Sequence, residues 1–282
     1  MTSSRRTILR GAVAGLLAPS VASAGYEKVA PSPTMTGIDI GRRFRERGVV
    51  GTFVLRDVQD DSVLVHNPSR AEEGFSPAST FKIPNSLISL EVGAVEDENE
   101  TLKWDGVKRP IEAWNKDHNM RSAITASTVW FYQEMARRVG EKRMKEWIER
   151  IGYGNRDISG GIDQFWLSGK LRITAHQQIE FLRRLQANDL PFSERTRRIV
   201  KDILILEEND SYVLRGKTGL GGGDGKPGEG KASVGWFVGW LERGPRAFVF
   251  ALNLDMKADT DIGVRKEIAV AVLRDLGLLA KG

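Results

Sequence analysis

Ser79 and Lys82 have the residue types and the spacing that suit nucleophilic chemistry. Residues three apart on a helical turn lie on the same face, so the serine hydroxyl and the lysine amine can meet. A serine attacks a carbonyl when a neighbouring base takes its proton, and a partly desolvated lysine can become that base. Because Pro84 is tolerated only near a helix start, we expect the pair in an opening turn, where free N–H groups favour an oxyanion. Taken alone, a helix cap and a solvated lysine explain the two residues better.

Two further short segments contain residues suited to the same chemistry. In Lys217-Thr218-Gly219, read as a strand, Lys217 and Gly219 point to one face, and the glycine lets a substrate lie against the backbone. The alternative is a lysine on an edge strand before a turn. Ser127-Thr128-Val129 lies in a helical region, where a helix cap is the alternative. Spacing alone does not show that these segments meet.

Composition excludes several other kinds of site. The chain has 282 residues and no cysteine, which excludes a thiol nucleophile, a disulfide and any cysteine-ligated metal. Its three histidines, His66, His118 and His176, do not favour a multi-histidine metal site. We therefore expect no metal and no bound cofactor.

The first 24 residues have the layout of a bacterial export signal. Arg5, Arg6 and Arg10 precede a mildly apolar stretch, and residues 22–24 are small, as signal peptidase requires. Residues 4–10 are also typical of a twin-arginine signal, with an ordinary Sec signal as the alternative. Removing this segment leaves 282 − 24 = 258 residues and lowers the net charge from +5 to 5 − 3 = +2. We expect a periplasmic protein with no nucleic-acid partner and, lacking other long apolar runs, no membrane span.

The remaining pattern predicts strands, then helices, then strands and a closing helix. Residues 50–56 and 62–66 alternate as a hairpin, while residues 141–151 have helical periodicity that ends at Gly152. Thr174 and Gln177 form a capping box at another helix. After residue 207 the strand period returns, over 212–217, 233–241 and 247–254, and residues 219–230 are interpreted as a hairpin tip.

This order predicts an α/β fold of the α+β type, with a central antiparallel sheet flanked by helices and interrupted by a helical insertion. We expect one catalytic domain over residues 25–282. Its sheet part would cover about 25–78 and 207–282, and its helical part about 79–206.

In chain order, the sequence resembles the class D (oxacillinase-type) serine β-lactamases over nearly the whole mature chain. Each segment is a weak match by itself, but the ordered set is highly specific. The matching segments are Pro77-Ala78-Ser79-Thr80-Phe81-Lys82-Ile83-Pro84, Lys103-Trp104-Asp105-Gly106 with Trp114, Ser127-Thr128-Val129, Tyr153-Gly154-Asn155, Phe165-Trp166-Leu167, Lys217-Thr218-Gly219 and Gly235-Trp236-Phe237-Val238-Gly239-Trp240.

The resemblance implies a serine acyl-enzyme mechanism. Ser79 would attack the lactam carbonyl, and Lys82 would be the general base for acylation and deacylation as a carbamate (N6-carboxylysine) formed with CO2 or bicarbonate. Ser127 would pass a proton to the lactam nitrogen. Trp166 would donate its indole N–H to the carbamate. The backbone N–H groups of Ser79 and Leu220 would form the oxyanion hole.

Substrate contacts follow from the same resemblance. Lys217 and Thr218 would hold the substrate carboxylate on the strand that contains Gly219, joined by Arg265, whose alternative role is a surface residue at a helix start. Val129 and Leu167, with Phe81, would line the apolar pocket around Lys82.

These roles imply an exported hydrolase that acts on β-lactams and confers resistance. The main alternative is a β-lactam-sensing or penicillin-binding module that is acylated without turnover. A peptidase acting on cell-wall peptides is a third possibility, which the Phe165-Trp166-Leu167 and Lys103-Trp104-Asp105-Gly106 segments disfavour.

Overall fold

A computed structural model describes residue 1 and residues 37–221, 233–257 and 260–279. The predicted export signal, apart from its first residue, and most of the predicted hairpin tip at 219–230 lie outside the described residues. The elements, in chain order, are α1 (Gly41–Glu46), β1 (Gly51–Asp57), β2 (Val63–His66), α2 (Pro68–Ala71), η2 (Ala78–Phe81), α3 (Lys82–Glu91), η3 (Glu112–Trp114), α4 (Met120–Ala126), α5 (Val129–Val139), α6 (Glu141–Ile151), α7 (Ala175–Gln186), α8 (Glu194–Ile203), β3 (Ile205–Glu208), β4 (Val213–Gly221), β5 (Ser233–Arg243), β6 (Arg246–Met256) and α9 (Val264–Asp275).

A six-stranded sheet is the centre of the described fold, in the order β2-β1-β6-β5-β4-β3, and every neighbouring pair is antiparallel. The middle strands β5 and β6 are buried along almost their whole length. Alternate residues of a strand point to opposite faces, and in β5 Trp236 contributes to one core whereas Phe237 contributes to the other. The sheet therefore needs an apolar cover on both faces.

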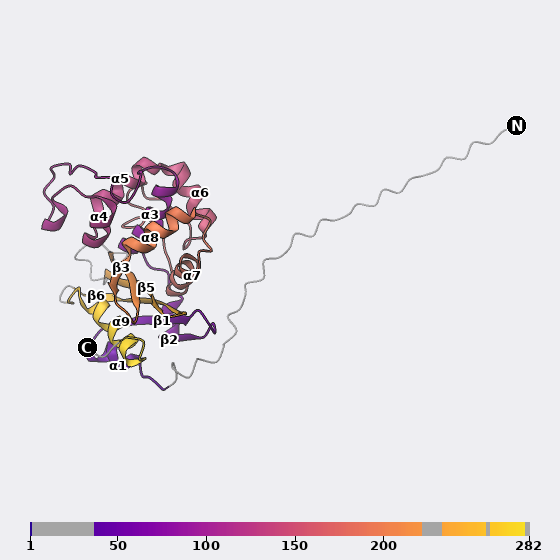
Figure 1. Cartoon of the computed structure of the whole chain (residues 1–282), viewed down its shortest axis with the longest axis vertical. Helices are drawn as coiled ribbons and strands as arrows, with labels where there is room; N and C mark the ends of the chain where they lie inside the picture. The colour runs from indigo at the N-terminus through magenta and orange to yellow at the C-terminus, as the bar shows by residue number, and fades with distance from the viewer. Residues whose placement is uncertain (2–36, 222–232, 258–259, 280–282) are drawn as a thin grey trace.

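Helices supply both covers (Figure 1). On one face α7 packs against β1, β5 and β6, and the helical part formed by α3 to α8 extends from there. On the other face α9 packs against β5 and β6, and α1 packs on α9. The larger hydrophobic core joins the helical part to the first face, and a smaller core lies under α1 and α9. The turn η2 contains the predicted nucleophile Ser79, and we call it the nucleophile turn. It lies against β4, at the junction of the sheet and the helical part.

The observed fold confirms the predicted class, an antiparallel sheet with a helical insertion between its strands. Helix α6 has the predicted bounds and ends at Gly152, which has a positive φ of 67°. The predicted capping box between Thr174 and Gln177 begins α7. The sequence pattern missed the edge strand β3, because the four residues Ile205–Glu208 are too short for a clear alternation and three of them are exposed.

The structure also corrects the predicted start of the hairpin tip. Strand β4 does not end near Lys217 but continues to Gly221, which pairs with Val234 of β5. The glycines at 219 and 221 therefore belong to the sheet.

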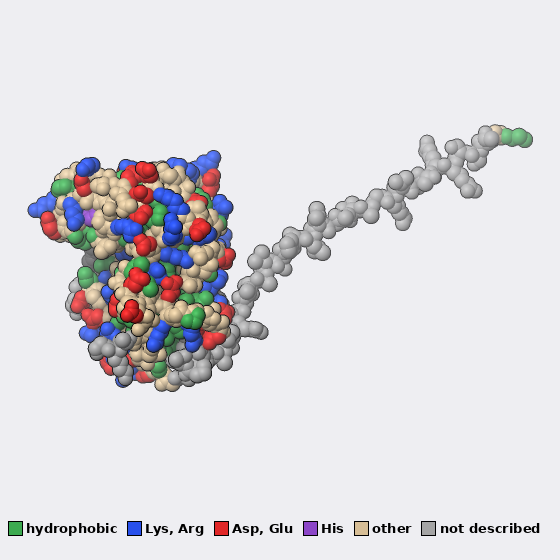
Figure 2. All heavy atoms as spheres, viewed as in Figure 1, with side chains coloured by type: hydrophobic (Ala, Val, Ile, Leu, Met, Phe, Trp, Pro, Cys, Tyr) green, Lys and Arg blue, Asp and Glu red, His purple; other side chains and the backbone are tan. Residues whose placement is uncertain are grey.

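Acidic and basic side chains are interspersed over the face shown in Figure 2. Within the described part of the chain, no helix has the length and apolar character needed to cross a membrane.

Candidate active site

The nucleophile turn places Ser79 beside Lys82. Ser79 does not lie in the opening turn of an α-helix, as expected, but in the preceding 3-10 turn η2, and Lys82 is the first residue of α3. The two segments are continuous, so the three-residue spacing still brings the side chains together. A hydrogen bond of 2.8 Å joins Lys82 Nζ and Ser79 Oγ. Ser79 is 7% exposed, which leaves its hydroxyl at the edge of the buried region.

Burial controls the charge of Lys82. The side chain is fully buried, and desolvation lowers the pKa of its amine well below the usual lysine range, with a smaller contribution from the positive charge of Lys217. Lys82 Nζ lies 5.3 Å from the centre of the Tyr132 ring. The environment therefore favours the neutral amine, which can accept a proton or react with an electrophile such as CO2.

Ser127 lies in the short link between α4 and α5. Its backbone is in the left-handed region, with φ of 55°, at the end of α4. This conformation is uncommon for a residue with a side chain and indicates a position that the surroundings impose. Lys217 Nζ donates a hydrogen bond of 3.0 Å to Ser127 Oγ. The helix link and β4 are thus joined at the serine for which proton transfer was predicted.

Lys217 is the second buried amine of the site. It is 5% exposed and also donates to the carbonyl of Thr218 at 3.0 Å. Desolvation, and to a smaller extent the charge of Arg265, lower the pKa of Lys217 to about 7. The amine can therefore exist in both charge states near neutral pH, and an anionic ligand would favour the charged one.

Gly219 has a packing reason to lack a side chain. A Cβ at this position would lie 3.1 Å from the carbonyl oxygen of Pro77 and 3.2 Å from Thr80 Cγ2. A Cβ at Gly221 would lie 2.9 Å from the Cβ of Ala78. The two glycines thus let β4 pack directly against the nucleophile turn, which brings Lys217 close to Ser79 and Lys82.

The remaining predicted contacts of a substrate lie around the end of β4. Arg265, in the first turn of α9, is 7% exposed and donates to the carbonyl oxygens of Gly219 and, at 2.8 Å, of Ile262. Burial lowers the pKa of its guanidinium. Thr218 is partly buried, and Leu220 pairs with Gly235 and has a side chain that is 46% exposed. Arg265 thereby adds a second basic side chain to the end of the strand that contains Lys217.

Trp166 supplies a buried donor next to the nucleophile turn. Its ring stacks on Phe81 at 5.2 Å between centroids, and the residue is 1% exposed. The indole Nε1–H finds no hydrogen-bond acceptor among the described residues. A buried donor without a partner is costly and fits an acceptor that joins the site, such as a carboxylate on Lys82. Val129, at the start of α5, and Leu167 are partly buried.

The Tyr153-Gly154-Asn155 segment supports the loop that contains Trp166. The Asn155 side chain donates to the carbonyl of Lys170 at 2.9 Å and accepts from the N–H of Arg172 at 3.0 Å. Gly154 has φ of 56°, and a Cβ there would lie 2.2 Å from the Arg172 carbonyl oxygen. These contacts give the segment a scaffold role.

The sequence reasoning missed His118, which is buried beside Thr128. His118 Nε2 lies 3.2 Å from Thr128 Oγ1 and 3.0 Å from the carbonyl oxygen of Ala113, and His118 Nδ1 lies 2.9 Å from Ser122 Oγ. Trp114 donates its indole N–H to the carbonyl of Ala126 at 2.9 Å. A lone histidine between weak motifs gives no sequence signal for such a contact.

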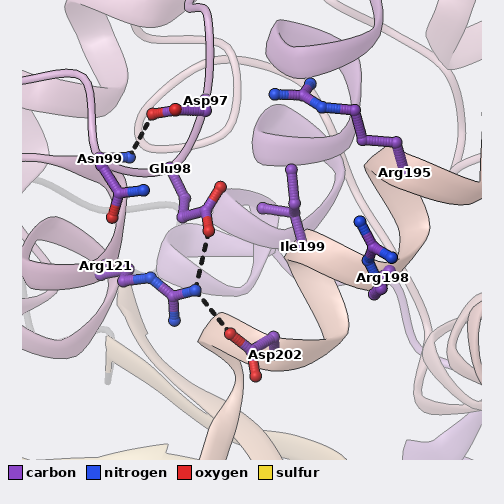
Figure 3. Close-up of a pocket in the computed structure, with 8 residues that line it drawn as sticks. All are labelled: Asp97, Glu98, Asn99, Arg121, Arg195, Arg198, Ile199 and Asp202. Carbon is purple, nitrogen blue, oxygen red and sulfur yellow. Dashed lines mark hydrogen bonds and ion pairs between the residues drawn. The ribbon is translucent and has the colours of Figure 1, made fainter.

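The acidic run at residues 96–100 is attached to the helices by ion pairs. Arg121 of α4 forms an ion pair with Glu98 of this run at 2.8 Å and another with Asp202 of α8 at 2.6 Å. The three residues line the polar pocket of Figure 3. Arg138 of α5 pairs with Glu100 at 2.9 Å. None of the predicted site residues lines this pocket.

Comparison with known proteins agrees with this geometry. The family model of the penicillin binding protein transpeptidase domain matches residues 51–274. The chain is 45% identical over 230 residues to a probable β-lactamase YbxI of Bacillus subtilis, covering 81% of this chain and 82% of the relative. It is 44% identical over 231 residues to β-lactamase OXA-48 of Klebsiella pneumoniae, covering 82% and 85%. A crystal structure of the class D β-lactamase YbXI from Nostoc superposes with a TM-score of 0.82 at 44% identity, covering 86% of this chain and all of the other.

The antiparallel sheet with its helical insertion and the serine–lysine pair identify the penicillin-binding-protein-like fold. Within that class, the identities and the structural match show that the chain belongs to the class D β-lactamases.

Proposed function

We propose that this protein hydrolyses the β-lactam amide of penicillins and related antibiotics through an acyl-enzyme on Ser79. The observation that carries this proposal is the buried Lys82 amine, 2.8 Å from Ser79 Oγ, in surroundings that favour its neutral form. The pair of Lys217 and Ser127, at 3.0 Å, supplies the second requirement, a route for a proton to the leaving nitrogen. The β-lactamase names of relatives at 44–45% identity support the same reaction.

In acylation, Ser79 Oγ gives its proton to the base at Lys82 and forms a bond to the lactam carbonyl carbon, and the carbonyl electrons move to the carbonyl oxygen. The backbone N–H groups of Ser79 and Leu220 stabilise that oxyanion. As the carbonyl re-forms, the C–N bond breaks, and the nitrogen takes a proton from Ser127, which Lys217 replenishes. In deacylation, the base at Lys82 takes a proton from the water that attacks the Ser79 ester, and this proton passes to Ser79 Oγ as the C–O bond breaks and the product acid leaves.

The residues around Lys82 fit a carboxylated form of this lysine. Its neutral Nζ would form a bond to CO2 and release one proton, and the free indole N–H of Trp166 would donate to the resulting anion. When present, the carboxylate supplies the general base for both half-reactions. The apolar ring of Phe81, stacked on Trp166, limits access of water to the pocket.

Substrate recognition is assigned to the cations at β4. Penicillins contain a carboxylate, and Lys217, Thr218 and Arg265 can hold it by charge-assisted hydrogen bonds. Gly219 keeps this strand against the nucleophile turn, so the bound lactam carbonyl would face Ser79. Val129 and Leu167 would contact the apolar part of the substrate.

We further propose that residues 1–24 direct export and that residues 25–282 form the periplasmic catalytic domain. Hydrolysis in the periplasm would remove the drug before it reaches its cell-wall targets, which is the basis of a resistance role. A sensor that is acylated without turnover would need the same Ser79, but it would not need a base that activates water for deacylation.

The test is turnover of a chromogenic cephalosporin and a penicillin by mature protein, with and without bicarbonate, together with intact-mass spectra. We expect turnover that rises with bicarbonate and only transient adducts. A stable one-to-one adduct on Ser79 without turnover would identify a sensor or a penicillin-binding protein. Failure to hydrolyse any β-lactam in the presence of bicarbonate would refute the proposed reaction.

A further inference from the structure

Ser76 lies where three segments of the active site cross. It precedes the nucleophile turn and is 7% exposed. Its hydroxyl lies 2.9 Å from the carbonyl oxygen of Trp166 and 3.2 Å from that of Leu167, so that one O–H is shared between two acceptors. Trp236 of β5 donates its indole N–H to the Ser76 carbonyl at 2.9 Å. The sheet therefore fixes the backbone of Ser76 through Trp236, and the side chain of Ser76 hydrogen-bonds the loop that contains Trp166.

The same hydroxyl also reaches the backbone beside the nucleophile. Ala78 has a positive φ of 46°, a conformation that costs free energy for a residue with a Cβ. Its N–H donates to the Trp166 carbonyl at 3.0 Å and approaches Ser76 Oγ at 3.4 Å. The strained residue next to Ser79 and the backbone of Trp166 thus share one hydrogen-bond cluster, which the Ser76 hydroxyl joins.

Stacking alone does not fix the direction of the Trp166 indole. The ring lies on Phe81 with an interplanar angle of 22° and meets Phe165 edge-on at 4.9 Å between centroids, and neither apolar contact specifies a hydrogen-bond direction. The N–H direction instead depends on where the backbone of Trp166 is held. Among the described side chains, that of Ser76 hydrogen-bonds the Trp166 carbonyl.

We propose that Ser76 is a positioning residue that aims the Trp166 indole N–H at carboxylated Lys82 and so sets how tightly the lysine retains CO2. This inference rests on the proposed function, because it requires the carboxylated form. It concerns residues of this chain that lie outside the Ser79, Lys82 and Lys217 motifs, and it gives a functional reason for a serine at a position where an apolar residue would also pack.

The test is a titration of mature protein with 13C-labelled bicarbonate, in which the NMR signal of carboxylated lysine gives the concentration for half-occupancy. We expect Ser76→Ala to raise that concentration about fivefold, which corresponds to about 1 kcal/mol at 1.4 kcal/mol per tenfold change. Ser76→Cys keeps the volume and weakens the donor, so it should change in the same direction. Ser76→Thr keeps the hydroxyl and should stay within about twofold of the wild type.

Two comparisons separate positioning from general loss of stability. Ser62→Ala removes another buried hydroxyl, in the turn between β1 and β2, and should lower the melting temperature without changing bicarbonate affinity. In a Trp166→Phe background, Ser76→Ala should have no further effect on half-occupancy, because the donor that Ser76 aims is gone.

Unchanged half-occupancy in both Ser76→Ala and Ser76→Cys would overturn the inference. An equal shift in Ser62→Ala, or an undiminished effect of Ser76→Ala in the Trp166→Phe background, would also overturn it. If the wild type itself gave no carboxylated-lysine signal, the proposed base would be wrong, and this inference with it. That failure is distinguishable because it needs no Ser76 variant.

Discussion

Replacement of Lys217 by methionine should stabilise the fold at neutral pH while weakening substrate binding. The folded protein lowers the pKa of Lys217 from 10.5 to about 7, chiefly by burial, so folding disfavours the charged amine. The lower pKa of the folded state corresponds to roughly 5 kcal/mol of destabilisation when both states are protonated, at about 1.4 kcal/mol per tenfold change in proton affinity. Methionine removes that cost but also the hydrogen bonds to Ser127 and Thr218, at about 1 kcal/mol each, which leaves a net gain of about 3 kcal/mol.

The stability difference between Lys217→Met and the wild type should depend on pH. Between about pH 7 and pH 10.5 the unfolded chain binds a proton at Lys217 that the folded protein lacks, so wild-type stability gains with rising pH. The advantage of Lys217→Met should therefore be greatest at pH 7 and below, and it should shrink as the pH approaches 10.

Urea unfolding of wild type and Lys217→Met at pH 6, 7, 8.5 and 10 measures this difference. The absence of cysteine keeps thiol chemistry out of the alkaline measurements. Lys217→Gln serves as a control that keeps a polar group in the same space, and it should gain less. A variant that is less stable than the wild type at pH 7, or a difference that does not change with pH, would refute the claim that the site buries this amine at a cost.

Four other predictions follow from the same geometry. Lys82→Ala should still be acylated slowly while deacylation nearly stops, so intact-mass spectra should show a lasting adduct, and normal steady-state turnover would contradict the assigned base. Trp166→Phe should require more added bicarbonate for half-maximal activity, and an unchanged bicarbonate response would exclude the donor role. Arg265→Ala should raise KM for penicillins about tenfold with a smaller change in kcat, equal to the loss of about 1.4 kcal/mol of carboxylate binding, and an unchanged KM would remove Arg265 from the substrate site. Gly154→Ala should lower stability by about 2 kcal/mol or more, because it adds a Cβ at φ of 56° and 2.2 Å from the Arg172 carbonyl oxygen, and an unchanged melting temperature would contradict that contact.

The sequence predicted those parts of the fold that have a strong local period. The apolar stripe of α6 and its terminal glycine determine a helix without reference to the rest of the chain. The capping box of α7 is equally local, because both partners lie within one turn. Strand β3 escaped prediction because it is short and exposed at the sheet edge, where no alternation is required.

The candidate site was less accessible to prediction, because its geometry depends on contacts between distant segments. Local spacing places Ser79 near Lys82, but only the packing of β4 on the nucleophile turn brings Lys217 to Ser127, 90 residues away along the chain. The role of Ser76 depends on a partner that is likewise 90 residues distant. A serine between a phenylalanine and a proline gives no pattern from which that contact could be read.

Three buried basic groups without an acidic partner explain why this site binds anions. Lys82, Lys217 and Arg265 are each less than 10% exposed, and within the described chain none of them pairs with an Asp or Glu side chain. Burial lowers the pKa of all three groups, so each carries an electrostatic cost that an internal carboxylate would ordinarily relieve. An internal carboxylate would, however, occupy the positions that the carboxylate of the substrate needs. In the proposed mechanism the missing negative charges arrive separately: the substrate brings one carboxylate to Lys217 and Arg265, and the reaction of the neutral Lys82 amine with CO2 creates the second. The electrostatic cost of burying these basic groups in the empty site would then favour the arrival of both carboxylates.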